Sequence, residues 1–122
     1  MHGKKSILRS KMIGLILLGH GSKLPDYRRV VERHRERIEE FGIFDEVRTA
    51  YIMEEPRLME VLSEMESDVI FVVPLFISYG EHLREIEEIV RGDGRVRLCK
   101  PIGESELLTY AIVLSALIQK TF

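Results

Sequence analysis

The sequence predicts an α/β fold in which helices cover both faces of a parallel four-stranded sheet. Continuous apolar runs at residues 13–18 and 69–76 have the length and composition of strands buried on both faces. Each run precedes a segment whose apolar residues recur at the 3.6-residue spacing of an amphipathic helix. Strands that alternate with helices in this way require right-handed crossovers, and therefore a parallel sheet of three α/β/α layers.

The first half of the chain supplies two of the predicted strand–helix units. Residues 13–18 end in a Gly19-His20-Gly21-Ser22 turn, and a helix opens at Pro25 and stops at Gly42. Its apolar stripe runs through Tyr27, Val30, Val31, His34, Ile38 and Phe41. The β-branched and aromatic residues of 47–52 predict the second strand, and Pro56 opens a second helix at 57–66.

The second half supplies the other two units. The third strand, residues 69–76, ends near Ile77, and Pro74 indicates that regular pairing fades there. A helix follows at 83–90, and the alternation at 96–98 predicts a fourth strand exposed on one face. The last helix, 104–119, is apolar around much of its circumference and is expected to be well buried, but its apolar run is too short to cross a bilayer.

Composition and charge limit the class of protein. The 122 residues suit one domain, and a net charge of −2 gives no general basic field for nucleic acid. Residues 1–11 hold four basic and no acidic side chains, and Met12 follows them. We therefore expect a basic leader at 1–11 and one domain at 12–122, in which fourteen basic face twenty acidic residues. A single cysteine, Cys99, predicts a reducing compartment, the cytoplasm.

The predicted topology brings two histidines together. For four such units the flavodoxin-like strand order 2-1-3-4 is expected, and ligands then bind at the carboxyl ends of strands one and three. His20 and His82 follow those two ends. Two neutral imidazoles in one crevice can bind a divalent metal and accept protons. Alternatively, His20 is a solvated part of a glycine turn and His82 only faces water at the start of its helix.

The remaining candidates carry weaker signals. His34 lies on an apolar stripe and is expected to pack rather than to bind, and Cys99 is expected to be structural. Glu54 and Glu55 follow the second strand, so either could reach the crevice or simply favour the start of the next helix. The chain has no phosphate-binding loop, zinc-protease or nucleophile-elbow motif.

Three ordered segments resemble a known family. They are LLGHGSK at 17–23, AYI at 50–52 with Glu55-Pro56 after it, and VVPLF at 72–76 running to Gly80-Glu81-His82. Together with PIG at 101–103 they resemble the small form of the class II tetrapyrrole chelatases, the CbiX-type sirohydrochlorin cobaltochelatases. The resemblance extends over residues 12–117 and predicts a chelatase-like variant of the fold.

The resemblance implies an ATP-independent lyase that inserts Co²⁺ into sirohydrochlorin on the anaerobic route to cobalamin, with no permanently bound cofactor. It identifies His20 and His82 as the catalytic, metal-binding pair. It also implies macrocycle contacts from Glu55, Ile77, Ser78, Tyr79, Gly80, Glu81 and His82. Met53 stands where the family usually has a glutamate, so whether Glu54 or Glu55 takes that role is open. Larger relatives carry two modules in tandem, which implies that this single module forms a homodimer.

Other functions stay open beside this one. The same fold could insert Ni²⁺ or Fe²⁺ for coenzyme F430 or sirohaem, because ligand type does not separate these metals. A non-catalytic tetrapyrrole- or metal-binding module, or a plain signalling domain, would share the topology. For a substrate rich in carboxylates, Lys23, Arg28 and Arg84 are the basic side chains expected near the crevice.

Overall fold

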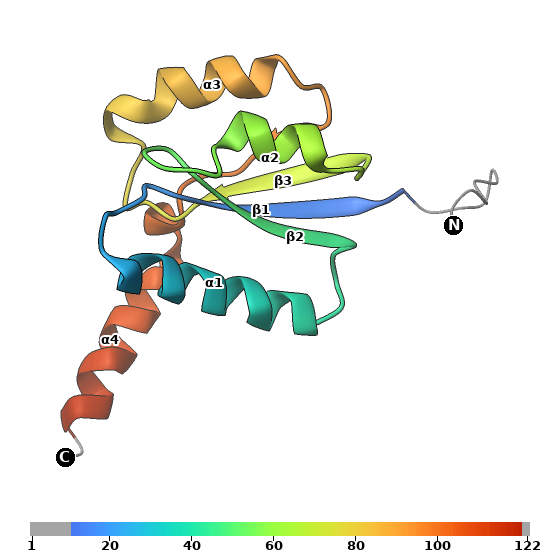
Figure 1. Cartoon of the computed structure of the whole chain (residues 1–122). Coiled ribbons are helices and arrows are strands. Elements are labelled where there is room, and N and C mark those ends of the chain that lie inside the picture. The colour runs from blue at the N-terminus through green and yellow to red at the C-terminus, as the bar shows by residue number, and fades with distance from the viewer. Residues whose placement is uncertain (1–10, 121–122) are drawn as a thin grey trace.

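The computed structural model describes residues 11–120 as a four-stranded parallel sheet with helices on both faces (Figure 1). The strand order is β2-β1-β3-β4, as the sequence predicts. Residues 1–10 lie outside the described residues, and so does almost all of the expected basic leader. The elements are β1 (Ile13–Gly19), α1 (Pro25–Glu40), β2 (Glu46–Tyr51), α2 (Leu58–Glu64), β3 (Val69–Pro74), α3 (Leu83–Arg91), β4 (Val96–Leu98) and α4 (Glu106–Lys120), with short 3-10 turns η1 (Gly80–His82) and η2 (Ile102–Glu104).

Strand order determines how the helices divide between the two faces. The chain steps from β1 to β2 in one direction and from β2 through β3 to β4 in the other, so right-handed crossovers put α1 on one face and α2 and α3 on the opposite face (Figure 1). The larger core lies under α2 and α3 and includes Ile16, Leu18, Ile70 and Ile86. A smaller core under α1 centres on Leu15, Leu17, Val31, Val47 and Tyr51.

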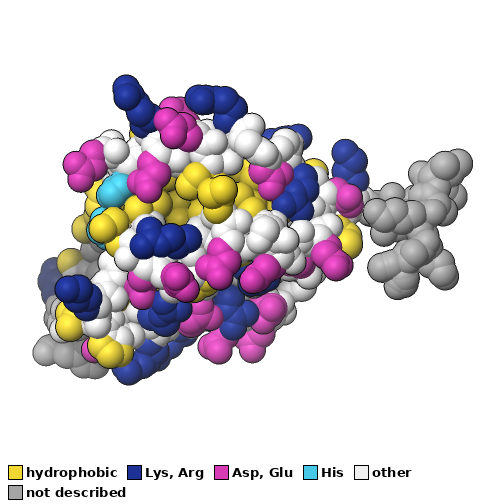
Figure 2. Space-filling model, turned by 45° about the horizontal axis from the view of Figure 1, so that its top comes forward, with side chains coloured by type: hydrophobic (Ala, Val, Ile, Leu, Met, Phe, Trp, Pro, Cys, Tyr) yellow, Lys and Arg dark blue, Asp and Glu magenta, His cyan; other side chains and the backbone are white. Residues whose placement is uncertain are grey.

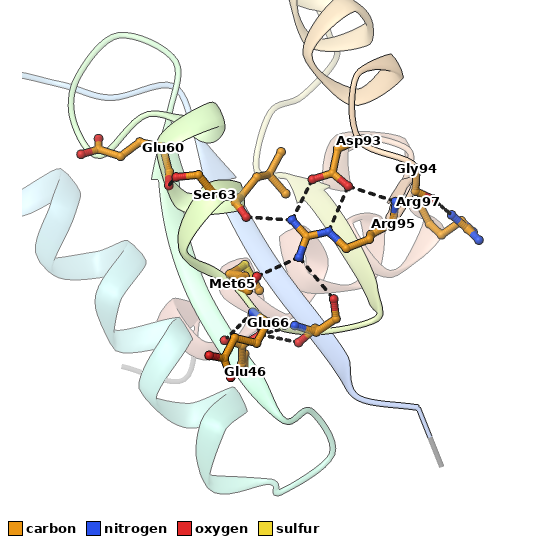
Figure 3. Close-up of polar contacts among 11 residues, drawn as sticks. Glu46, Glu60, Ser63, Met65, Glu66, Asp93, Gly94, Arg95 and Arg97 are labelled. Carbon is orange, nitrogen blue, oxygen red and sulfur yellow. Dashed lines mark hydrogen bonds and ion pairs between the residues drawn. The ribbon is translucent and has the colours of Figure 1, made fainter. Parts of the chain in front are cut away.

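One arginine fastens α2 to the sheet at the amino end of the strands. The guanidinium of Arg95, which precedes β4, donates to the carbonyl oxygens of Leu62 and Met65 at the end of α2, each at 2.8 Å (Figure 3). Asp93 holds the guanidinium from the other side at 2.8 Å, and this ion pair keeps the pKa of the Asp93 carboxyl below its ordinary value. The cation therefore satisfies carbonyl groups that the end of a helix leaves unpaired.

Three expectations about individual elements are wrong or need adjustment. The final helix α4 is not buried: every residue from 109 to 120 is exposed, and Figure 1 shows the helix leading away from the sheet. His34 is exposed on α1 rather than packed, because α1 packs against the core through Tyr27, Val31 and Ile38. Strand β3 ends at Pro74, and the chain continues irregularly from there to η1. Within residues 11–120 no helix has the length and apolar character needed to cross a membrane.

Candidate functional site

The structure brings His20 and His82 together at the carboxyl edge of the sheet. His20 follows β1, and His82 is the last residue of η1, which the segment after β3 leads into. The centroids of the two imidazole rings lie 5.1 Å apart, and the ring planes meet at 68°. His20 is exposed, and the His82 side chain keeps 20% of its surface accessible. Figure 2 shows histidine side chains at the surface beside hydrophobic ones.

Phe76 lies against both histidines. Its ring centroid is 6.5 Å from that of His20 and 6.4 Å from that of His82, and Phe76 is itself buried, with 9% of its surface exposed. An aromatic ring in contact with both imidazoles limits the orientations that either can take. The sequence prediction treated Phe76 as the end of a strand. Its place in the VVPLF segment was the available signal, but periodicity alone does not reveal a ring contact with two loops.

Two hydrogen bonds made by the backbone of His20 hold the turn that contains this residue. The N–H of His20 donates to the hydroxyl of Tyr27 at 2.8 Å, and its carbonyl oxygen accepts from the N–H of Met53, also at 2.8 Å. Tyr27 lies on the first turn of α1, and Met53 follows β2. The sequence prediction assigned Tyr27 to the apolar stripe only, because a phenol can pack with its ring and still donate or accept with its hydroxyl.

Glu54, which follows β2, also holds the His20 turn in place. Its carboxylate accepts from the N–H of Ser22 and from the guanidinium of Arg28, each at 2.9 Å. The bond from Ser22, followed by the pairing with Arg28, lowers the pKa of the Glu54 carboxyl from its ordinary value. Gly21 has a φ of +105°, and a Cβ there would lie 3.1 Å from Cγ of Glu54. Glycine therefore allows both the turn and the approach of the carboxylate.

Glu55 has a different environment from Glu54. Its carbonyl oxygen accepts from Arg28, but its side chain is exposed and its carboxylate has no hydrogen-bond or ion-pair partner among residues 11–120. Of the two candidate glutamates, Glu54 is thus committed to holding the His20 turn, whereas the carboxylate of Glu55 is open to solvent.

The segment after β3 offers an exposed surface beside the histidines. Ile77, Ser78, Gly80 and Glu81 are all exposed, Ile77 to 74%. Tyr79 is the anchored member: its ring packs against the core under α2 and α3, and its hydroxyl donates to the carbonyl oxygen of Cys99 at 2.7 Å. Burial raises the pKa of this phenol, so it stays protonated as a donor.

Gly103 of η2 packs against the segment that follows β3. Its N–H donates to the carbonyl oxygen of Phe76 at 2.8 Å. A Cβ at Gly103 would lie 2.1 Å from the carbonyl oxygen of Ile77, which is inside van der Waals contact. Only glycine lets the two backbones approach this closely. The position of η2 therefore fixes Phe76 and, through it, the surroundings of the two imidazoles.

The arrangement can bind an ion weakly and accept protons. Nδ1 of His82 is 3.5 Å from a carboxylate oxygen of Glu85, and Nδ1 of His20 is 3.3 Å from the carbonyl oxygen of Gly21. Within the described part of the chain, no group of three or more His, Cys, Asp or Glu side chains is placed to hold a metal. Two imidazoles leave further positions on a divalent ion for water or for other nitrogen ligands.

Basic side chains surround the His20 turn. A hollow of about 460 Å³ adjoins it, lined by Ser22, Lys23, Leu24, Pro25, Arg28, Arg29, Glu32 and Glu54. Arg28 is paired with Glu54 and lies over the ring of Tyr51, 4.7 Å from its centroid. Lys23 and Arg84, by contrast, are exposed and have no ion-pair partner among residues 11–120. Both cations are therefore accessible to an anionic ligand.

Residues 14–117 match the model of the CbiX family. The chain is 45% identical over 76 residues to a Halobacterium salinarum protein named "Probable sirohydrochlorin cobaltochelatase", covering 62% of this chain and 26% of that protein. It is 39% identical over 77 residues to the sirohydrochlorin cobaltochelatase of Methanopyrus kandleri, covering 60% and 54%. The chain thus spans about a quarter and about half of these two relatives. The crystal structure of a CbiX protein from Marinobacter aquaeolei is similar with a TM-score of 0.65 and 29% identity, covering 89% of this chain and 97% of that one.

Proposed function

Because this chain belongs to the CbiX family, we propose that it inserts Co²⁺ into sirohydrochlorin without ATP, as a step of anaerobic cobalamin biosynthesis. The observation that carries the proposal is the pair of imidazoles, His20 and His82, with ring centroids 5.1 Å apart at an exposed edge. Two relatives of this chain are named as sirohydrochlorin cobaltochelatases, one of them as a probable one. The cytoplasm remains the expected compartment.

The reaction consumes a divalent ion and releases protons. Insertion of Co²⁺ replaces two pyrrole N–H hydrogens, so two protons leave for each ion that enters. A neutral imidazole can accept such a proton, and it can also hold Co²⁺ and let it go more readily than a thiolate cluster would. We assign His20 as the principal base and metal ligand, and His82 as its partner at the same edge.

The macrocycle lies, in this proposal, on the exposed surface formed by residues 77–82. Ile77 offers apolar contact to the ring system, and Ser78, Gly80 and Glu81 are exposed beside it. Tyr79 acts as the anchor of this segment through its bond to Cys99. Glu55 reaches the macrocycle from the β2 side with its carboxylate, which is exposed. Lys23 and Arg84 pair with substrate carboxylates at the rim.

The functional unit in this proposal is a pair of chains. The site lies on an open edge of a single small domain, whereas the Halobacterium relative is much longer than the region it shares with this chain. A second copy facing the same edge would cover the other side of a flat macrocycle and exclude water from the ion.

Absorbance spectroscopy of sirohydrochlorin tests the activity. Full-length protein is mixed with the macrocycle and Co²⁺, Ni²⁺ or Fe²⁺ in separate anaerobic reactions, without ATP, beside protein-free controls. We expect the metallated spectrum to appear faster with protein, and fastest with Co²⁺. If Ni²⁺ or Fe²⁺ is preferred, the metal assignment is wrong. Binding of the macrocycle without accelerated metallation would identify a carrier, and an unchanged spectrum would contradict both readings.

A further inference from the structure

The two nitrogens of each imidazole in the candidate site have different surroundings. Nδ1 of His20 lies 3.3 Å from the carbonyl oxygen of Gly21, and Nδ1 of His82 lies 3.5 Å from Oε1 of Glu85. Among residues 11–120, neither Nε2 has a protein hydrogen-bond partner. Each ring thus has one nitrogen beside a protein oxygen and one nitrogen that no described residue binds.

The nature of the two oxygens decides which nitrogen carries the hydrogen. A backbone carbonyl and an ionised carboxylate accept hydrogen bonds and donate none. A neutral imidazole has one N–H nitrogen and one nitrogen with a free lone pair. Both contacts are therefore hydrogen bonds only when Nδ1 carries the hydrogen, in His20 and in His82. The lone pair that can accept a proton or bind a metal ion is then on Nε2 of each ring.

The backbone on both sides of the contact between His82 and Glu85 is held in place. His82 is the N-cap residue of α3, and its N–H donates to the carbonyl oxygen of Tyr79 at 3.1 Å. Glu85 is the third residue of α3, and Ile86 after it is fully buried. A glutamate at this position often accepts from the N-cap N–H. Because Tyr79 already accepts from that N–H, the Glu85 carboxylate is available to the imidazole.

Glu85 does not complete a metal site of its own. Within the described range 11–120, no group of three or more His, Cys, Asp or Glu side chains is placed to hold a metal. Its carboxylate contacts Nδ1 of His82, whereas the nitrogen left for an ion is Nε2. Metal-binding histidines commonly donate their other ring N–H to a carboxylate or a backbone carbonyl, which fixes the tautomer and the ring orientation. His82 has the first kind of partner and His20 the second.

We propose that Glu85 is a positioning residue for His82, holding its ring in the Nδ1–H form so that Nε2 is the atom that accepts the proton and binds Co²⁺. The carbonyl oxygen of Gly21 does the same for His20. The inference rests on the proposed function and deepens it, because it names the reacting atoms and the groups that orient them. The Glu85 side chain is 54% exposed, so its removal should change the surroundings of the ring without opening a cavity in the core.

Nitrogen NMR of the full-length protein, without metal or macrocycle, tests the tautomer of His82. In ¹⁵N-labelled wild type at about pH 8.5, where histidine side chains are neutral, we expect Nδ1 to have the chemical shift of an N–H nitrogen. In Glu85→Ala the His82 signals should move toward the Nε2–H form, which free histidine favours in water. His82→Gln identifies these signals. An Nε2–H form in wild type, or signals that Glu85→Ala leaves unchanged, would overturn the proposal.

The same spectra contain two internal comparisons. His20 should show the Nδ1–H form in wild type and in Glu85→Ala, because its partner is a backbone carbonyl that this substitution does not remove. His34, which is exposed on α1, should show the form of free histidine in both samples. An Nε2–H form of His20 would overturn the role given to Gly21.

Metallation kinetics test whether the contact serves the reaction. Loss of a group that orients a metal-binding histidine typically costs about 10–100-fold, and for an exposed carboxylate we expect kcat of Glu85→Ala to fall about tenfold, with the KM for sirohydrochlorin unchanged. Glu88→Ala is the matched control, because it removes the same charge from an exposed position of α3 and should match wild type. Equal rates of the two variants, or a change in KM alone, would overturn the positioning role.

A double variant separates positioning from direct contact with the substrate. If Glu85 acts only through His82, adding Glu85→Ala to His82→Ala should change the rate by less than about twofold, although Glu85→Ala alone lowers it about tenfold. The same tenfold loss in both backgrounds would mean that Glu85 acts by a route that does not include His82, and would overturn the proposal.

The NMR measurement keeps this inference separate from the proposed function. The expected tautomers in a protein that does not accelerate metallation would retain the hydrogen-bond assignment and contradict the chelatase assignment. Metallation by wild type together with an Nε2–H form of His82 would retain the function and overturn the role of Glu85.

Discussion

The backbone of Gly103 lies directly against that of Ile77, so that a Cβ on Gly103 would stand 2.1 Å from the Ile77 carbonyl oxygen. Ile77 belongs to the segment that leads to His82, and Gly103 belongs to the turn from which α4 departs. One contact thus joins the candidate site to the last helix of the chain.

Gly103→Ala should damage both stability and the site. The added methyl group must push the 76–77 backbone outward, and overpacking of this kind costs about 1–3 kcal/mol. Urea unfolding measures the loss. The control is Gly94→Ala, because a Cβ at Gly94 meets nothing within 4 Å. Equal stability of Gly103→Ala and Gly94→Ala would mean that the backbone of Ile77 moves away from a Cβ at Gly103 at little cost in the free energy of unfolding.

Glu54→Gln should lose stability near neutral pH but not in acid. The folded-state pKa of Glu54 is lowered, so its carboxylate contributes stability above its unfolded pKa, and that contribution disappears as the pH falls through the folded value. Urea unfolding over a series of pH values downward from about pH 7 should therefore show a difference from wild type that shrinks as the pH falls. Glu55→Gln is the control, because it removes a carboxylate that has no partner within the described residues 11–120. A difference that persists in acid would contradict the assigned role of the charge.

Arg95→Met should destabilise the fold without altering the histidine pair. It removes the donors to Leu62 and Met65 and the ion-pair partner of Asp93, and hydrogen bonds to charged groups each contribute about 1.5–3 kcal/mol. We expect a loss of about 2–3 kcal/mol in urea unfolding. Arg91→Met, at an exposed position of α3, should stay near wild type. A loss shared equally by both variants would argue against the capping role.

The double variant Lys23→Glu/Arg84→Glu should raise the KM for sirohydrochlorin several-fold and leave kcat nearly unchanged. Exposed charges at a rim mainly steer an oppositely charged ligand, and the effect should shrink as salt is added. The control double variant, Arg33→Glu/Arg37→Glu, makes the same charge change on exposed residues of α1. An equal rise in KM in both would indicate overall charge rather than these two side chains.

Strand positions were predictable because a strand that is buried on both faces has a continuous run of apolar residues in the sequence. The apolar runs of β1 and β3 stand out against the helices around them, and the topology then brings His20 and His82 to one edge. Contacts between loops produce no comparable pattern in the sequence. Spacing does not reveal that Glu54, rather than Glu55, accepts from the N–H of Ser22.

The final helix shows where apolar periodicity misleads. An apolar circumference predicts that α4 is buried, but it does not say by what, and in a single chain α4 is exposed. His34 shows a related error: its place on a stripe predicted packing, whereas the side chain is exposed on α1. Both errors arise because burial depends on the surface opposite, which the local sequence does not describe.

The most direct test of the account is the initial rate of Co²⁺ insertion into sirohydrochlorin by wild type, His20→Ala, His82→Ala and His34→Ala. General base groups typically contribute about 10²–10⁴-fold, so His20→Ala should fall by that order and His82→Ala by at least about tenfold. His34→Ala, an exposed histidine on α1, should match wild type. If His20→Ala and His82→Ala metallate as fast as wild type, the central claim that this pair carries the chemistry is wrong.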